Sequence, residues 1–406
     1  MSHVSASTIS LLVSVMFVWA ANGLCFTLLA LRMSIEGFDT MDIGLVTTGY
    51  FFGQLLGAIF FGIIIERVGH VRAFAAFASL LSAGVIGYVL YVDLIVWSCI
   101  RVLHGMCIAG LLMVVESWLN GSVSNKSRGR LLALYTIVQS ISMSLGQQLL
   151  NLEEPNSFIL FAVASIFFSL ALIPLVLSRS VSVGEVAPSR LKFRELIKIS
   201  PLGVMGSLGS GALVSILIGL SPIYLGTLGL SISQIALFMS VIIFGGLIVQ
   251  YAVGRASDIF DRRTIIAVAL FFGGSLCLAI SLTPGLNFWT LLGLTTIYSG
   301  IIFAVYPLSV AHANDYLDVD DLVPASAGLI MAMAIGATVG PLVTTMYMEY
   351  FGNSGFFVFS SIICFMIGGV AIFRMSRRSA PDMKDQGPYV LVSRTTPASV
   401  ELDPRT

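Results

Sequence analysis

The sequence predicts an all-α membrane protein whose twelve transmembrane helices form two six-helix halves related by a pseudo-two-fold repeat. Of its 406 residues, 57% are hydrophobic and only 10% are charged, whereas a soluble protein carries about a quarter charged residues. Apolar runs of about twenty residues, each long enough to cross a bilayer as a helix, recur along almost the whole chain. Alternating ten-residue strands are absent, which excludes a membrane β-barrel. A charged motif that recurs at a fixed distance indicates the two halves.

Charged or turn-rich breaks divide the apolar runs into the twelve expected helices. The N-terminus has no basic segment, and the first apolar run is too long for a signal peptide, so this run is expected to be the first transmembrane helix. The expected helices span residues 8–31, 43–65, 72–92, 94–118, 130–150, 157–177, 201–226, 233–253, 263–282, 287–312, 324–347 and 353–374.

A polar interval after the sixth expected helix separates the two halves. Residues 1–177 are expected to form the N-terminal half and residues 201–374 the C-terminal half. Residues 178–200 are expected to form a cytoplasmic linker, with a short basic amphipathic helix at SRLKFRELIK on the membrane surface. The tail, residues 375–406, is rich in Pro, Ser and charge and is expected to be disordered.

The distribution of basic residues predicts the orientation of the chain. All 21 Lys and Arg residues except Arg32 and Arg101 lie in the loops after helices 2, 4, 6 and 8 or in the tail. Apart from Arg32, all the charged residues in the loops on the opposite side are acidic. By the positive-inside rule the basic side is cytoplasmic, so both termini are expected in the cytoplasm.

The loop after the second expected helix has a counterpart in the second half. The first copy, GIIIERVGHVR, begins at Gly62, and the second, GRASDIFDRRT, begins at Gly254. At this offset of 192 residues, Glu66 meets Asp258. Two six-helix halves in parallel duplication, each with such a loop, are the repeat plan of one class of secondary transporters. Without a gap, the same offset also pairs Phe52-Gly53 with Phe244-Gly245 and Gly37 with Gly229.

With these motifs the chain resembles the major facilitator superfamily over about residues 8–374. GIIIERVGHVR resembles the signature loop of that family, with Glu66 where Asp is usual. In the second copy, Ile259 and Asp261 replace the expected base and glycine, which predicts a weaker loop there. RVLHGMCIAG, which begins at Arg101, resembles the Arg-xxx-Gly element of the fourth helix.

Four further stretches resemble a small bacterial subgroup of that superfamily, the YcaD-like permeases. The resemblance implies a multi-pass protein of the bacterial inner membrane. The stretches read VVESWLN, NKSRGRLLALY, GLSPIYL and YPLSVAHAND.

The resemblance also implies that the signature loop clasps the two halves together on the cytoplasmic side in the outward-open state. A carboxylate at Glu66 would meet the N-terminus of the eleventh helix, which Pro324 marks. Glu116 is a candidate partner of Arg67 or Arg72. Alternatively, these charges only anchor the topology. The expected clasp comprises Gly62, Glu66, Arg67, Gly69, Arg72, Glu116, Gly254, Asp258 and Arg262.

Two titratable side chains lie inside the fourth expected helix. Arg101 follows Asp93 by eight residues, about 12 Å into the helix, and a cation at that depth normally faces a cavity or a partner. His104 lies on the same face. This pair suits proton coupling or anion capture. The resemblance implies a cavity between helices 1, 4, 7 and 10, and the candidate pathway residues are Arg101, His104, Asn22, Trp19, Gln139, Tyr224, Tyr298 and Tyr306.

Each of these residues also has a structural interpretation. Arg101 is alternatively a member of a structural ion pair, and His104 a packing histidine bonded to a backbone carbonyl. Tyr298 and Tyr306 are alternatively packing aromatics. Arg32 is expected to be an interfacial anchor.

Other motifs limit the possible chemistry. The five cysteines are scattered singly without CxxC spacing, so neither a disulfide framework nor a metal site is expected. No P-loop, HExxH or GxSxG motif occurs, so the chain is expected to be neither ATP-driven nor an enzyme, and to need no cofactor. Gly336 and Gly340 have the small-xxx-small spacing of closely packed membrane helices.

The sequence therefore predicts a secondary active transporter that moves a small organic solute by alternating access, as a symporter coupled to protons. One cation with hydroxyl, amide and aromatic groups fits an anionic or zwitterionic solute. The expected partners are the solute, protons and the lipid bilayer, without nucleic acid, and the chain is expected to be a monomer. Two alternatives remain: a drug or metabolite efflux antiporter, and a non-transporting membrane sensor of the same fold.

Overall fold

The computed structural model describes residues 6–121, 125–177, 193–318, 321–377 and 389. All regular secondary structure in these residues is helical. The chain packs as two compact units, of which the first holds Met1–Val186 with Gly219–Ser240 and the second holds the remainder. Most of the linker and tail predicted from the sequence lies outside the described residues.

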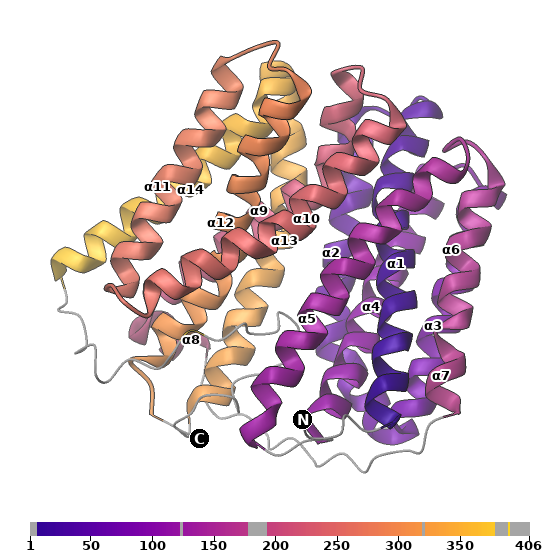
Figure 1. The fold of residues 1–406 in the computed structure, drawn as a ribbon, viewed down its shortest axis with the longest axis horizontal. Helices are drawn as coiled ribbons and strands as arrows, with labels where there is room; N and C mark the ends of the chain where they lie inside the picture. Colours follow the sequence, from indigo (N-terminus) through magenta and orange to yellow (C-terminus); the bar gives the residue numbers. More distant parts are fainter. Residues whose placement is uncertain (1–5, 122–124, 178–192, 319–320, 378–388, 390–406) are drawn as a thin grey trace. The chain divides into compact units, whose positions relative to one another are not determined.

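The first unit contains the helices of the N-terminal half, together with the adjoining ends of α9 and α10. Its helices are α1 (Ala6–Ile35), α2 (Thr40–Val68), α3 (His70–Leu90), α4 (Leu94–Gly121), α5 (Asn125–Gln148), η1 (Leu149–Leu152), α6 (Phe158–Leu170) and α7 (Leu172–Val176) (Figure 1).

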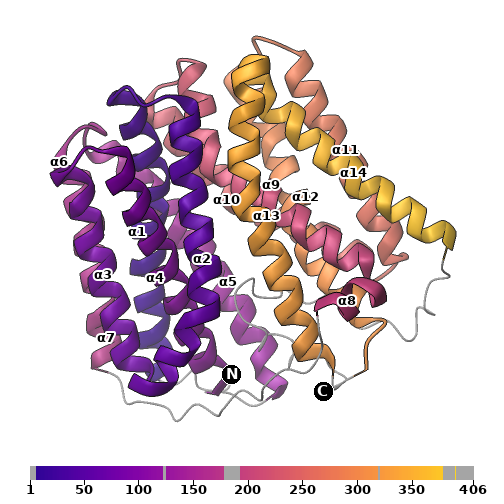
Figure 2. The same cartoon turned by 180° about the vertical axis from the view of Figure 1, so that it is seen from behind.

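The second unit contains the short helix α8 and most of the C-terminal half. Its helices, with the shared α9 and α10, are α8 (Phe193–Ile199), α9 (Pro201–Thr227), α10 (Ile232–Ser257), α11 (Arg262–Leu282), α12 (Phe288–Asn314), α13 (Leu322–Phe351), η3 (Gly352–Ser354) and α14 (Gly355–Arg377) (Figure 2).

The helices confirm the predicted membrane class. Within the described residues, 10 segments are long and apolar enough to cross a membrane, and the segment Pro324–Arg377 contains two helices, α13 and α14. The sixth expected helix is interrupted, because α6 ends at Leu170 and α7 begins at Leu172. Pro174 explains this interruption, since it has no N–H to donate to the carbonyl four residues earlier.

Backbone conformation repeats between the halves. Gly37 follows α1 with φ 85°, and Gly229 follows α9 with φ 73°. Glycine adopts this left-handed region at little cost, so the sequence match at these positions is also a structural match. The halves differ at the next turn, because Gly69 has φ 84° whereas its counterpart Asp261 has φ −49° and caps α11.

Glycines bring α1 against α5 and α9 against α13. A Cβ at Gly146 would lie 2.1 Å from the carbonyl oxygen of Ala20, and one at Gly336 would lie 1.8 Å from that of Leu208. Both distances are far below van der Waals contact, so only glycine permits these crossings. The expected close packing at Gly336 is therefore present, and Gly146 has the corresponding role in the first half.

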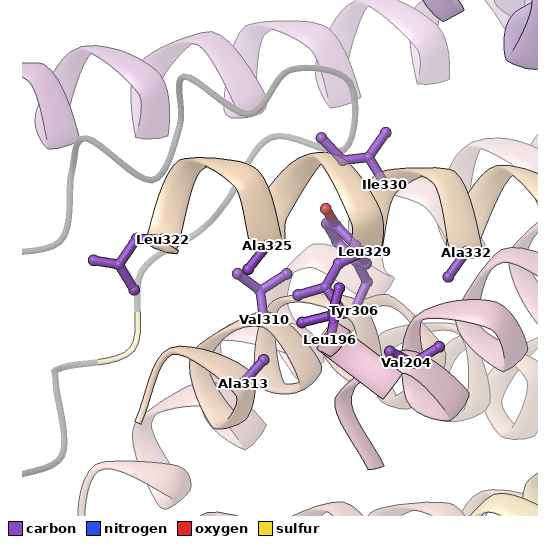
Figure 3. Packing of buried hydrophobic residues seen from close by; sticks show 10 residues of the cluster. All are labelled: Leu196, Val204, Tyr306, Val310, Ala313, Leu322, Ala325, Leu329, Ile330 and Ala332. Atoms are coloured by element: carbon purple, nitrogen blue, oxygen red, sulfur yellow. The ribbon is translucent and has the colours of Figure 1, made fainter. Parts of the chain in front are cut away.

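The helix α8 joins the second unit through its apolar face. Leu196 of α8 is 1% exposed and packs in a cluster built from α9, α12 and α13. Figure 3 shows these residues along and around the first turns of α13: Leu196, Val204, Tyr306, Val310, Ala313, Leu322, Ala325, Leu329, Ile330 and Ala332.

Candidate functional site around Arg101

Close contact between α2 and α4 positions the buried arginine of α4. A Cβ at Gly105 would lie 1.9 Å from the carbonyl oxygen of Tyr50, and one at Gly53 would lie 2.0 Å from that of Val102. The two backbones therefore touch directly. As a result, Tyr50 of α2 is held beside Arg101 of α4.

The Arg101 guanidinium is buried among aromatic rings. The residue is 2% exposed, and its Cζ lies 4.9 Å from the ring centroid of Phe26 and 5.2 Å from that of Tyr50. Among the described residues, its Nε and Nη1 groups have no hydrogen-bond partner. Stacking on rings stabilises a desolvated cation only in part, so two charged N–H groups in this site have unmet hydrogen-bonding capacity.

Further polar atoms surround this arginine. The Tyr50 hydroxyl donates to Asn22 Oδ1 at 3.4 Å and accepts from Gln54 Nε2 at 3.2 Å. The Nδ2 of Asn22 and the Nε2 of His104 have no hydrogen-bond partner in the part of the chain that the structure describes. His104 is 3% exposed, with its ring edge-to-face against Tyr50 and Phe168. The site thus combines one cation, one imidazole and one amide.

No described carboxylate lies within ion-pair distance of Arg101. Arg32, in contrast, pairs with Glu36 (Nε–Oε1, 2.7 Å) and donates to the carbonyl of Asn156. Arg32 and Arg101, the two arginines that lie outside the basic loops and tail, therefore differ. The Arg32 guanidinium has partners at the end of α1, whereas Arg101 retains N–H donors for another partner.

The other candidate pathway residues are distributed over both units. In the first unit, Trp19 and Tyr224 are buried, and Gln139 is half-buried on α5. In the second unit, Tyr298 lies beside Cys277 of α11 and Ser360 of α14. Tyr306 is fully buried in the cluster of Figure 3. Asn22 and His104 are thus the candidates that the structure places with Arg101.

Sequence patterns did not reveal the aromatic rings of this site. Phe26 and Tyr50 lie in runs of apolar residues, where a ring that contacts a cation cannot be distinguished from one that packs against other side chains. Gln147, fully buried and bonded to Thr27 through its Oε1 at 2.6 Å, was also not singled out. Its signal was available, because a glutamine inside a membrane span needs a partner.

The first signature loop is a turn of one glycine. Gly69 ends α2 by donating to the carbonyl of Ile65 at 2.9 Å, and α3 begins at His70. The side chains of Glu66, Arg67 and Arg72 are exposed. Elsewhere in the first unit, a Cβ at Gly62 would lie 3.4 Å from the Met113 side chain. Glu116 is 1% exposed near Tyr135 of α5.

The second signature loop contacts a residue of the tail. Asp258 accepts a hydrogen bond of 2.6 Å from the backbone N–H of Tyr389. Gly254 faces the Tyr389 ring, where a Cβ would lie 2.3 Å from a ring carbon, and Gln250 Nε2 donates to the Tyr389 hydroxyl at 3.4 Å. Asp258 and Gly254 therefore have a local partner on their own unit.

Arg262, expected among the clasp charges, forms a buried ion pair. Its Nη1 lies 2.6 Å from Oδ2 of Asp315, and the side chains are 2% and 3% exposed. Asp315 follows the last turn of α12, so this pair ties the start of α11 to the end of α12.

We expect Asp315→Asn to destabilise the protein by about 3–5 kcal/mol, because it removes the carboxylate charge that pairs with the buried Arg262 guanidinium. Thermal unfolding of the purified protein in detergent measures this effect. The double replacement Arg262→Met with Asp315→Leu removes both charges and should recover most of the loss. An unchanged midpoint for Asp315→Asn would show that the pair is not a structural tie.

Asp261 caps α11 beside this pair. Its carboxylate accepts from the Arg263 backbone N–H at 2.9 Å and from Arg263 Nη2 at 2.8 Å. Burial alone would raise the pKa of Asp261, but the hydrogen bonds and charge of Arg263 hold this pKa below its usual value. Arg263 is thereby partly neutralised by its own helix cap.

Hydrogen bonds join α5 to the start of α10, at the end away from the basic loops. Ser144 and Ser240 each donate through Oγ to the other's carbonyl, at 3.1 and 2.8 Å. Gln148 Nε2 donates to Ser240 Oγ at 2.6 Å and to the carbonyl of Ala236 at 3.1 Å. The first half and the beginning of α10 are thus connected by a compact polar network.

The sequence profile of the Major Facilitator Superfamily matches residues 11–319 and 253–398 of the chain. The chain belongs to the major facilitator superfamily. The predicted family and fold are therefore confirmed, and the superfamily consists of transporters, so the expectation that the chain is not an enzyme also holds.

Relatives place this superfamily member near the subgroup that its motifs resemble. The uncharacterized MFS-type transporter YcaD of Escherichia fergusonii is 28% identical over 346 residues, covering 84% of this chain and 88% of YcaD. An uncharacterized MFS-type transporter of Enterobacter sp. strain 638 is 28% identical over 372 residues, covering 90% of this chain and 95% of the relative.

Solved structures share the fold of this superfamily member at low identity. A crystal structure of the nucleoside transporter NupG has a TM-score of 0.74 at 12% identity, covering 92% of this chain and 100% of NupG. A D-xylose-proton symporter has a TM-score of 0.71 at 15% identity, covering 95% of this chain and 99% of the symporter.

Proposed function

We propose that this transporter is a secondary active carrier that moves a small organic solute across the inner membrane by alternating access, coupled to protons. The observation that supports the proposal most directly is the Arg101 guanidinium, which is buried in a membrane helix and has two N–H groups without hydrogen-bond partners among the described residues. Buried polar groups normally find partners. A solute or a proton-linked water that arrives during transport would supply them.

The donors around Arg101 favour a carboxylate-bearing anion or zwitterion as the solute. A guanidinium matches a planar carboxylate through two parallel hydrogen bonds. The Asn22 amide offers another donor, and the Phe26 and Tyr50 rings border an apolar side. We place Trp19, Gln139, Tyr224, Tyr298 and Tyr306 in the same pathway, with roles secondary to Arg101.

Proton coupling is proposed through His104. An imidazole titrates near neutral pH in water, and His104 adjoins Arg101 with a free Nε2. The D-xylose-proton symporter, which shares the fold, couples its solute to protons, as its name states. We propose symport here, with the basic side and both termini cytoplasmic, and with the protein acting as a monomer.

The two signature loops are proposed to bias the conformational cycle from the basic side. Glu66 is exposed next to the single-glycine turn at Gly69, so its carboxylate is available to a helix N-terminus on the other half. The polar network of Ser144, Gln148 and Ser240 lies at the opposite ends of the helices from the basic loops. We propose that it shifts the conformational equilibrium in the direction opposite to the signature loops.

We expect Glu66→Gln and Gln148→Ala to shift the conformational equilibrium in opposite directions. Loss of the carboxylate removes about 1 kcal/mol of helix-terminus attraction and should raise labelling of a pathway cysteine from the cytoplasmic side. Gln148→Ala should raise labelling from the outer side. Asp258→Asn is the matched control and should change cysteine labelling less than Glu66→Gln does, because Asp258 already accepts a hydrogen bond from the backbone N–H of Tyr389. Equal labelling in all variants would contradict the clasp.

The transport proposal is tested first by a thermal-shift screen of the purified protein against carboxylates, amino acids, nucleosides and sugars. Solutes that stabilise the wild type should fail to stabilise Arg101→Ala. Uptake into proteoliposomes under an imposed pH gradient then measures coupling, and His104→Gln should alter the pH dependence of uptake. Export of lipophilic drugs would favour the efflux antiporter, and ligand binding without flux would favour the sensor.

A further inference from the structure

A basic pocket lies within the second unit, far along the chain from Arg101. It is built where the end of α8 and the start of α9 meet the start of α11 and the ends of α12 and α14, and Figure 2 shows α8 beside the first turns of α9. Its lining residues are Ile199, Ser200, Pro201, Leu202, Arg263, His312, Tyr316 and Arg374.

One of the lining residues carries a buried hydroxyl without a partner among the described residues. Ser200 is 1% exposed, and its Oγ forms no hydrogen bond in the described structure. The residue precedes Pro201, the first residue of the 27-residue helix α9. Free N–H groups and the partial positive charge of a long helix N-terminus favour an anion at this position. The unpartnered hydroxyl is an independent indication of a ligand.

The charges around the pocket are net positive. Arg374, half-buried in the last turn of α14, has no ion pair among the described residues. Arg263 also lines the pocket, but its Nη2 forms an ion pair with Oδ2 of Asp261 at 2.8 Å. His312 stacks edge-to-face with Tyr316 at the wall. Arg374 is therefore the principal cation open to a bound anion.

Exposed apolar side chains at this end of the unit indicate whether the bound anion is a lipid headgroup or a free phosphate. Phe260, in the turn before α11, is 57% exposed, and Ile372 and Phe373, next to Arg374, are 52% and 55% exposed. Ile197 of α8 is 41% exposed. These residues would contact acyl chains, whereas a free phosphate would gain nothing from them. All of them lie on the basic side of the chain.

We propose that this pocket binds the phosphate group of an anionic phospholipid. A phosphate oxygen lies between Ser200 Oγ and the Arg374 guanidinium at the start of α9, and the acyl chains extend along the exposed Phe260 and Phe373 side chains. Clusters of basic residues at the cytoplasmic surface attract anionic lipids in general. The site assigned here adds a defined buried hydroxyl and one defined arginine.

The test uses the full-length protein, delipidated in detergent, with native mass spectrometry and thermal unfolding as readouts. The probes are phosphatidylglycerol, zwitterionic phosphatidylcholine and inorganic phosphate. Phosphatidylglycerol should remain bound and raise the unfolding midpoint, and the other two should not. Arg374→Gln should weaken phosphatidylglycerol binding about tenfold or more, because it removes a charge-assisted hydrogen bond to the phosphate. Ser200→Ala should also weaken it, without loss of fold, because the hydroxyl bonds to nothing.

Arg377→Gln is the matched control, since Arg377 lies one turn further along α14 and stacks on Phe373 at 5.4 Å. It should leave binding within about twofold of the wild type, because it does not line the pocket. Equal losses for Arg374→Gln and Arg377→Gln would overturn the site and leave only general surface attraction. Equal protection by inorganic phosphate would overturn the lipid assignment in favour of a free phosphate or a phosphorylated solute. Neither outcome bears on Arg101.

Discussion

Replacing Arg101 with methionine is expected to raise the thermal stability of the purified protein while abolishing solute binding. Two charged N–H groups are buried without partners, and each unsatisfied buried donor costs about 1–3 kcal/mol. Cation–π contacts with the Phe26 and Tyr50 rings offset about 0.5–2 kcal/mol of this destabilisation. Methionine fills a similar volume without the charge, so the unfolding midpoint should rise by about 2 °C or more.

Arg32→Met is the control for this prediction. Arg32 already pairs with Glu36 and the carbonyl of Asn156, so its removal should lower the midpoint or leave it unchanged. Arg101→Lys should retain little solute binding if the guanidinium grips a carboxylate through two bonds, and more if a point charge suffices. A lower midpoint for Arg101→Met, with solute stabilisation intact, would identify Arg101 as structural.

The second large effect is expected at the crossing that places Tyr50 beside Arg101. Gly105→Val should prevent folding, because a Cβ there would lie 1.9 Å from the backbone oxygen of Tyr50. The backbones of α2 and α4 cannot move apart at this point without separating the two helices. The loss of folding free energy should therefore exceed the 1–3 kcal/mol that is typical of about one extra methylene in a core. The recovery of monodisperse protein in size-exclusion chromatography measures the effect.

Gly369→Ala is the matched control, since nothing lies within 4 Å of a Cβ at Gly369 in α14. Alanine is favoured over glycine in a helix interior by about 0.5–1 kcal/mol, so this variant should be recovered as well as the wild type and unfold at an equal or higher temperature. If Gly105→Val were recovered equally well, the close crossing of α2 and α4 would be wrong.

Composition and hydropathy were sufficient to predict the helices, because membrane spans have a length fixed by the bilayer. The predicted helix over residues 263–282 is observed as Arg262–Leu282. Glycine spacing was informative as well: Gly37 and Gly229 share a left-handed conformation, and Gly336 lies at a helix crossing. These features depend on local sequence, so one chain suffices to find them.

Contacts between distant segments could not be predicted in the same way. Arg262 pairs with Asp315, 53 residues away, and no local pattern connects the two. The sequence did not indicate which way Tyr298 and Tyr306 point. Every residue of α12 from Tyr298 to Val310 is buried, and a helix that is buried all round has no amphipathic signal. The interruption at Pro174, in contrast, could have been predicted, because a proline inside a span removes one backbone donor.

If Arg101 links solute movement to protons, its removal should uncouple the two in reconstituted membranes. Wild-type and Arg101→Ala proteins are reconstituted into proteoliposomes that contain a pH-sensitive dye, and a solute that stabilises the wild type in the thermal-shift screen is added outside. We expect a solute-dependent change of internal pH with wild-type protein and none with Arg101→Ala, at equal amounts of inserted, folded protein. Equal pH changes with both proteins would contradict this expectation.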